Sequence, residues 1–169
     1  MNAERKFPYP DASFQYVFSE HLFEHLSYMG GKNMLYETYR VLKPQGIFRL
    51  TMPGLEFLVD LYLNKEDEVF EKYVEWNISE FAPEIARDFR SEKIPRMFVI
   101  NNFMRFWGHK MIYDKETITL LLQKAGFKNI TYPRIGESSQ AVFKNIEQHG
   151  KKIPDWANRL ESFVVEAQK

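Results

Sequence analysis

The stretch Phe14-Gln-Tyr-Val-Phe-Ser-Glu-His-Leu-Phe-Glu-His-Leu26 decides the fold. Its first part, residues 14–18, is a run of strand-forming side chains with little polar alternation, which is typical of a strand buried on both faces of a parallel sheet. Ser19, Glu20 and His21 follow at the carboxyl end of this strand, where open α/β sheets place their ligands. We therefore predict a buried strand that delivers polar side chains to a site.

The segments after this strand predict a mixed α/β fold. Apolar positions recur on one helical face across residues 31–42, Lys43-Pro-Gln-Gly46 predicts a turn, and residues 47–52 form a second strand. Strand, helix and strand in this order predict a parallel crossover. Further helices are expected at residues 55–63, 66–78, 98–107 and 114–125, and further strands at 127–132 and 162–167. We predict one domain, residues 1–169, in which residues 55–110 form a helical insertion.

Composition excludes several classes of partner. The 169 residues include 23 basic and 23 acidic side chains, so no net charge favours nucleic acid or an anionic membrane surface. The absence of cysteine excludes disulfides and thiolate metal sites and suits a reducing cytoplasm. No apolar run reaches the roughly 18 residues that span a bilayer. We expect a cytoplasmic protein with a small-molecule substrate, in which the many aromatic residues form a bulky core or an apolar lid over a ligand.

Three motifs carry a resemblance to a known family. Pro8-Tyr-Pro-Asp-Ala-Ser-Phe14, followed by Ser19–Leu26, resembles a "PFPD-x-SFD … EHL" segment; Arg40–Ile47 resembles "R-V-L-K-P-G-G"; Leu121–Phe127 resembles "LL-x-x-AGF". In this order they are similar to the class I S-adenosylmethionine (SAM)-dependent methyltransferases, and the tail resembles a short bacterial subfamily. The resemblance implies a Rossmann-like sheet and SAM as cofactor.

The family's glycine-rich SAM loop and the acid that binds the ribose have no counterpart in this sequence. Only 13 residues precede the first strand, and the pair Gly30-Gly31 follows a helix start. By resemblance the chain holds strands four to seven of an incomplete sheet, and we expect the natural polypeptide to begin upstream of Met1. The strand at residues 14–18 would then be an edge, covered by a second copy, another chain or the N-terminal arm.

The resemblance also implies roles for individual residues. Ser19, Glu20 and His21 would face the methionine end of SAM, and Asn2 would accept a hydrogen bond from an amino group of the cofactor. His21 is the predicted general base, because histidine takes up and releases protons near neutral pH. The structural alternative for His21 is a polar turn or cap residue.

His25, His109 and Tyr113 are the predicted acceptor-binding residues, with capping and packing as the structural alternatives. His21-Leu-Phe-Glu-His25 also matches the H-x-x-E-H pattern of inverted zincins. The sequence identifies no third ligand, and the methyltransferase motif explains the same residues, so we predict no metal.

Two functions remain open from the sequence. The first is a SAM-dependent methyltransferase, or the C-terminal part of one, that acts on a small or glycan-like acceptor. The second is an inactive methyltransferase-like module that binds or oligomerises through its open sheet edge. Binding of SAM would distinguish the two.

Overall fold

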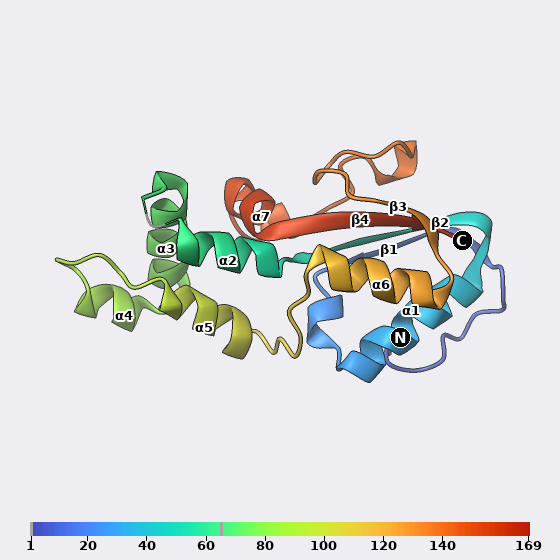
Figure 1. Ribbon diagram of the computed structural model, residues 1–169, viewed down its shortest axis with the longest axis horizontal. Coiled ribbons are helices and arrows are strands. Elements are labelled where there is room, and N and C mark those ends of the chain that lie inside the picture. Colours follow the sequence, from blue (N-terminus) through green and yellow to red (C-terminus); the bar gives the residue numbers. More distant parts are fainter. Residues whose placement is uncertain (1, 65) are drawn as a thin grey trace.

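The computed structural model describes residues 2–64 and 66–169 and is built on a mixed four-stranded sheet (Figure 1). The strand order is β1-β2-β4-β3. β1 (Phe14–Glu20) and β2 (Leu42–Pro53) are parallel, whereas β4 (Ser162–Gln168) is antiparallel to both β2 and β3 (Lys128–Thr131). The predicted α/β class, the four strands and the parallel first pair are confirmed.

Two helices cover one face of the sheet, and an irregular segment lies over the other (Figure 1). α1 (Tyr28–Val41) and α6 (Lys115–Ala125) pack their apolar faces against the strands in the main hydrophobic core. Residues 132–154 cross the opposite face and contain only two short 3₁₀ turns, η2 (Ala141–Phe143) and η3 (His149–Lys151). This segment brings residues from late in the sequence to the end of β1.

Both ends of α6 are capped. The Asp114 carboxylate accepts a hydrogen bond from the Thr117 N–H at 2.7 Å. Gly126 ends the helix with φ of 106°, and a Cβ at this position would lie 2.8 Å from the Tyr39 ring. The segment 43–46 differs from its prediction, because β2 already begins at Leu42. Instead of a separate turn, the pairing of β1 with β2 is irregular there and Gln45 takes a φ of 66°.

The predicted insertion forms a second hydrophobic core beyond the end of the sheet (Figure 1). It contains α2 (Leu55–Leu63), α3 (Glu68–Phe81), α4 (Pro83–Asp88) and α5 (Met97–Arg105), and α7 (Asp155–Glu161) packs against them. The short helices α4 and α7 were not predicted. No helix in the described ranges combines the length and the apolar character that crossing a bilayer requires.

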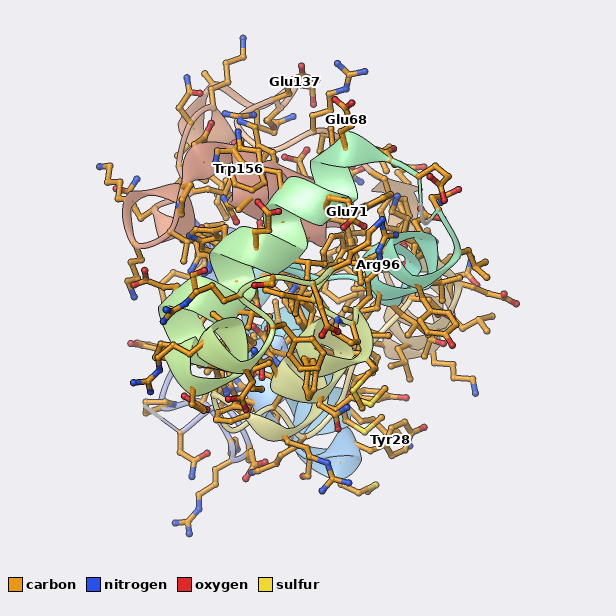
Figure 2. The ribbon with its side chains drawn as sticks, turned by 90° about the vertical axis from the view of Figure 1, so that its left-hand side faces the viewer. Tyr28, Glu68, Glu71, Arg96, Glu137 and Trp156 are labelled. Carbon is orange, nitrogen blue, oxygen red and sulfur yellow. The ribbon has the colours of Figure 1, made fainter. Side chains whose placement is uncertain are left out.

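Glu71 on α3 forms an ion pair with a buried arginine. Arg96 is buried, and its Nε donates to Glu71 Oε1 at 3.0 Å while its Nη1 donates to the Asn64 carbonyl at 2.8 Å. Figure 2 shows Glu71 on α3 beside Arg96. This ion pair ties α3 to the start of α5.

β1 is an edge strand, since among the described residues its backbone pairs only with β2. The N-terminal arm, residues 2–13, follows α1 instead of this edge. The Phe7 N–H donates to the Glu37 carboxylate at 2.7 Å, and Arg40 Nη1 donates to the Tyr9 carbonyl at 2.8 Å. The arm therefore does not provide the predicted cover for β1.

Candidate functional site

All four histidines of the chain line one cavity of about 550 Å³. His21 and His25 come from the segment after β1, His109 from the segment after α5, and His149 from η3. The insertion provides an aromatic wall of Trp76, Phe81, Phe103 and Trp107. The volume is that of a small-molecule pocket. The cavity lies at the carboxyl end of β1, where the sequence predicts the site.

Glu24 lies at the centre of the histidines. It belongs to η1 (Phe23–His25), is only 1% exposed, and neither carboxylate oxygen has a hydrogen-bond partner. Its Oε1 lies 3.3 Å from His21 Nδ1 and 3.9 Å from His25 Nε2. Burying a carboxylate costs free energy unless a cation or hydrogen-bond donors compensate its charge. Glu24 therefore needs a positively charged partner in this cavity.

The His21 ring is held from several sides. Its Nδ1 faces Glu24, its Nε2 lies 3.2 Å from Ser162 Oγ, and the ring stacks on His149 with centroids 3.6 Å apart. The backbone N–H of His21 donates to the Thr51 carbonyl at 2.9 Å, with φ at 44°. A non-glycine residue rarely adopts this conformation, which costs free energy and is often found at functional sites. A carboxylate beside one ring nitrogen orients histidine for proton transfer through the other.

Two titratable groups on the far side of His21 have shifted pKa values. Burial and the nearby His21 lower the pKa of His149 to about 4, so its ring is neutral at pH 7. Burial raises the pKa of Glu161 to about 7, against the opposing effect of its hydrogen bond with the Tyr73 hydroxyl. His149 Nε2 lies 3.9 Å from Glu161 Oε1. This wall of the cavity therefore carries little charge below neutral pH.

A tight turn places His109 against Glu24. Trp107 and Gly108 have φ values of 58° and 77°, and the N–H groups of Lys110 and Met111 donate to the Glu24 carbonyl at 2.8 and 3.1 Å. His109 Nδ1 lies 2.8 Å from the Phe103 carbonyl, so this nitrogen donates and leaves Nε2 as the acceptor. Burial lowers the pKa of His109.

Three of the predicted site residues, His21, His25 and His109, line the cavity together. Ser19 and Glu20 do not line it. The Ser19 hydroxyl is buried at the end of β1 without a hydrogen-bond partner, and the Glu20 carboxylate accepts the N–H groups of Gln148 and His149 at 2.9–3.0 Å. Glu20 thereby anchors η3, and its predicted contact with a cofactor stays a prediction.

Asn2 and Tyr113 lie outside the cavity lining. Asn2 is exposed and its side-chain oxygen accepts the Glu4 N–H at 2.8 Å. Tyr113 is buried against Phe23, its hydroxyl has no partner, and burial raises its pKa to about 12. Neither position is brought to the histidines, so the predicted roles of both residues stay predictions.

Sequence reasoning missed Glu24, His149 and Glu161 as site residues. Glu24 was seen only as part of a motif, and its isolation from donors is a tertiary feature. His149 lies in a polar segment without periodicity, 128 residues after His21. Its identity as one of only four histidines was the single signal for it in the sequence.

A family model and several solved structures are similar to this chain. A family model of the methyltransferase domain matches residues 1–50. A SAM-dependent methyltransferase from Thermotoga maritima superposes with a TM-score of 0.52 at 15% identity, over 99% of this chain and 61% of that protein. This chain has the class I methyltransferase fold. Its Rossmann-like sheet agrees with the resemblance found in the sequence.

A second methyltransferase of this fold, a SAM-dependent enzyme from Methanosarcina mazei, superposes with a TM-score of 0.50 at 16% identity, over the whole of this chain and 65% of that protein. The methyltransferase-like chain thus spans less than two thirds of the length of either solved structure. A comparison with curated protein sequences finds no match.

The glycine pair of the methyltransferase-like chain does not form a cofactor loop. Gly30 and Gly31 lie inside α1, and a Cβ at Gly31 would meet the Phe23 ring at 3.0 Å, so they serve helix packing and form no cofactor loop. The Ser19 hydroxyl at the end of β1 is buried without a hydrogen-bond partner and lies outside the cavity lining. The described residues therefore place no glycine-rich loop at the end of β1.

Proposed function

We propose that this chain forms the acceptor-binding part of a cytoplasmic SAM-dependent methyltransferase. The observation that carries the proposal is the convergence of all four histidines and the buried Glu24 on one cavity at the carboxyl end of β1. The fold supports a ligand site at this end of the sheet. SAM would supply the methyl group, and this chain would hold the acceptor and receive its proton.

His21 is the proposed general base. Glu24 accepts the Nδ1–H of His21 in the proposal, which leaves the lone pair of Nε2 to take a proton from a hydroxyl or amine. In the structure Nε2 lies next to the Ser162 hydroxyl, a position that an acceptor hydroxyl would occupy instead. His149, stacked on the other side, is neutral at pH 7 and keeps the ring in place.

The cavity lining favours a small acceptor with a flat or apolar face. Trp76, Phe81, Phe103 and Trp107 provide surfaces for stacking, and the histidines provide hydrogen-bonding groups at the opposite side. Phenols, aromatic amines and sugars combine these two properties. His25 and His109 contribute to acceptor binding in this proposal.

Replacement of His21 by glutamine is expected to lower the rate of methyl transfer about 10²- to 10⁴-fold, because the acceptor proton loses its base. The affinity for S-adenosylhomocysteine, measured by calorimetry, should stay within about threefold of the parent. The assay uses SAM labelled in the methyl group and a panel of phenols, amines and sugars. Lys128→Gln, an exposed change on β3, is the matched control.

An unchanged rate in the His21→Gln variant would contradict the assignment of the base. Absence of S-adenosylhomocysteine binding at millimolar concentration would contradict the enzyme proposal altogether. That result would favour the alternative, a methyltransferase-like binding module. The free edge of β1 is the observation that supports this alternative.

We also propose that the free edge of β1 pairs with a strand from outside the described residues. Exposed strand edges invite pairing, and Gln15 and Tyr16 are exposed on β1. A second copy of the chain would provide this strand in a homo-oligomer. Sedimentation of the purified chain as a monomer at all concentrations would contradict a second copy as the partner.

A further inference from the structure

The atoms of Glu24, His25 and His109 that can bind a metal lie within 4.8 Å of one another. Two nitrogen ligands and one carboxylate are the donor set of many catalytic zinc sites. In a tetrahedral site with bonds of about 2.1 Å, ligand atoms are roughly 3.4 Å apart. The ligand atoms would therefore have to approach one another by up to about 1.4 Å when a metal binds.

The isolation of Glu24 is a second, independent observation. Its carboxylate is almost completely buried, and neither oxygen receives a hydrogen bond. Buried carboxylates in folded proteins are paired with cations or coordinate metals. His21 Nδ1 and His25 Nε2 lie 3.3 and 3.9 Å from Oε1, and neither makes a hydrogen bond with the carboxylate. A metal ion between Glu24, His25 and His109 would compensate the buried carboxylate.

The surroundings hold His109 as metal ligands are usually held. Histidine ligands commonly donate their second ring N–H to a carbonyl or carboxylate, which fixes the ring and its tautomer. His109 Nδ1 has this relation to the Phe103 carbonyl at 2.8 Å, so Nε2 is the nitrogen left to bind a metal. The backbone bonds from Lys110 and Met111 to the Glu24 carbonyl join the two ligand-bearing segments.

We propose that Glu24, His25 and His109 bind a zinc-type divalent ion whose open coordination position faces the cavity. This revises the expectation from the sequence that the chain holds no metal. The H-x-x-E-H pattern supplies two of the ligands, Glu24 and His25, but the third comes from His109 and not from His21. A metal of this kind binds an acceptor oxygen and makes its proton easier to remove. That role rests on the proposed function, whereas metal binding itself does not.

The test measures metal binding without SAM or an acceptor, so that it is independent of methyl transfer. The purified chain is stripped with a chelator and titrated with Zn²⁺ in competition with a chromophoric chelator. We expect one equivalent of zinc to bind and the affinity to fall at least about 100-fold in Glu24→Gln and His109→Gln. His149→Gln, which changes a histidine of the same cavity that is not a proposed ligand, should stay within about threefold.

A fourth variant keeps the test conclusive if the others fold poorly. His109→Cys, loaded with Co²⁺, should show the intense near-ultraviolet absorption of a thiolate bound to the metal. Circular dichroism of each variant checks its fold. Failure of the parent chain to bind stoichiometric zinc would overturn the proposal, as would an equal loss of affinity in His149→Gln or a cobalt-loaded His109→Cys without the thiolate band.

Discussion

Replacement of Arg49 by methionine is expected to lower the free energy of unfolding by about 3–5 kcal/mol. Arg49 is fully buried on β2, and its guanidinium lies 2.5 Å from the carboxylates of Glu147 and Glu166. Its Nη1 also donates to the Glu137 carbonyl at 2.9 Å. Removal of the cation would leave two buried carboxylates uncompensated. Urea unfolding of the parent and the variant at pH 7 measures the difference.

The control for Arg49 removes all three charges at once. A triple variant, Arg49→Met with Glu147→Gln and Glu166→Gln, is expected to lose clearly less stability than Arg49→Met alone, because no unpaired charge remains. Lys110→Gln, which removes an exposed ion pair with Glu4 at 3.8 Å, should cost at most about 1 kcal/mol. If Arg49→Met lowers the free energy of unfolding by no more than Lys110→Gln does, the ion pairs of Arg49 are not important for stability.

Replacement of Glu161 by glutamine is expected to stabilise the protein progressively as the pH rises. The pKa of Glu161 is about 7 in the folded chain, against 4.5 for an unperturbed carboxyl. Between these values the folded state holds a proton that the unfolded state has lost, so the stability contributed by this proton is complete below pH 4.5 and is lost as the pH rises through 7. Glutamine stays neutral throughout. The stability gained by the variant should therefore grow by about 2–3 kcal/mol between pH 4.5 and pH 8.

Urea unfolding of both proteins across this range tests the effect of Glu161. The groups around Glu161 are Tyr73, His149, His21 and the more distant Glu24. His149, with its lowered pKa, makes the fold lose stability as the pH falls from 6.5 to 4, which opposes the effect of Glu161 in the parent. Because His149 is present in both proteins, its contribution largely cancels when the free energies of unfolding of the variant and the parent are subtracted. A difference that does not change with pH would contradict the raised pKa of Glu161.

Elements with local signals could be predicted from the sequence. β1 and β2 are rich in aromatic and aliphatic strand-forming residues, and α6 carries its own start and stop signals in Asp114 and Gly126. α4 and α7 were missed because helices of six or seven residues show too few turns for a clear periodicity. Arg49 was missed for a different reason: its partners Glu147 and Glu166 follow about 100 residues later, and only the folded sheet brings them together.

In the candidate site, too, only the residues with a local or family signal could be predicted from the sequence. His21 and His25 stood out because they follow the first strand directly, and His109 because of the family resemblance. The convergence of these residues with His149 depends on contacts without a local sequence pattern. Glu20 anchors the backbone of η3, and the turn at Trp107 and Gly108 turns His109 toward Glu24. The resemblance could name the fold, but tertiary contacts create the cavity.

The histidines themselves allow the most direct test that this cavity faces the cofactor. Because all four line the cavity, their ring C–H signals in a ¹H–¹³C correlation spectrum report on it without any label added to the site. Titration with S-adenosylhomocysteine is expected to shift these signals, those of His21 most, and the shifts should follow the calorimetric binding curve. Saturable binding that leaves all four histidine signals unmoved would contradict the assignment of the cavity to the acceptor side of a methyltransferase site.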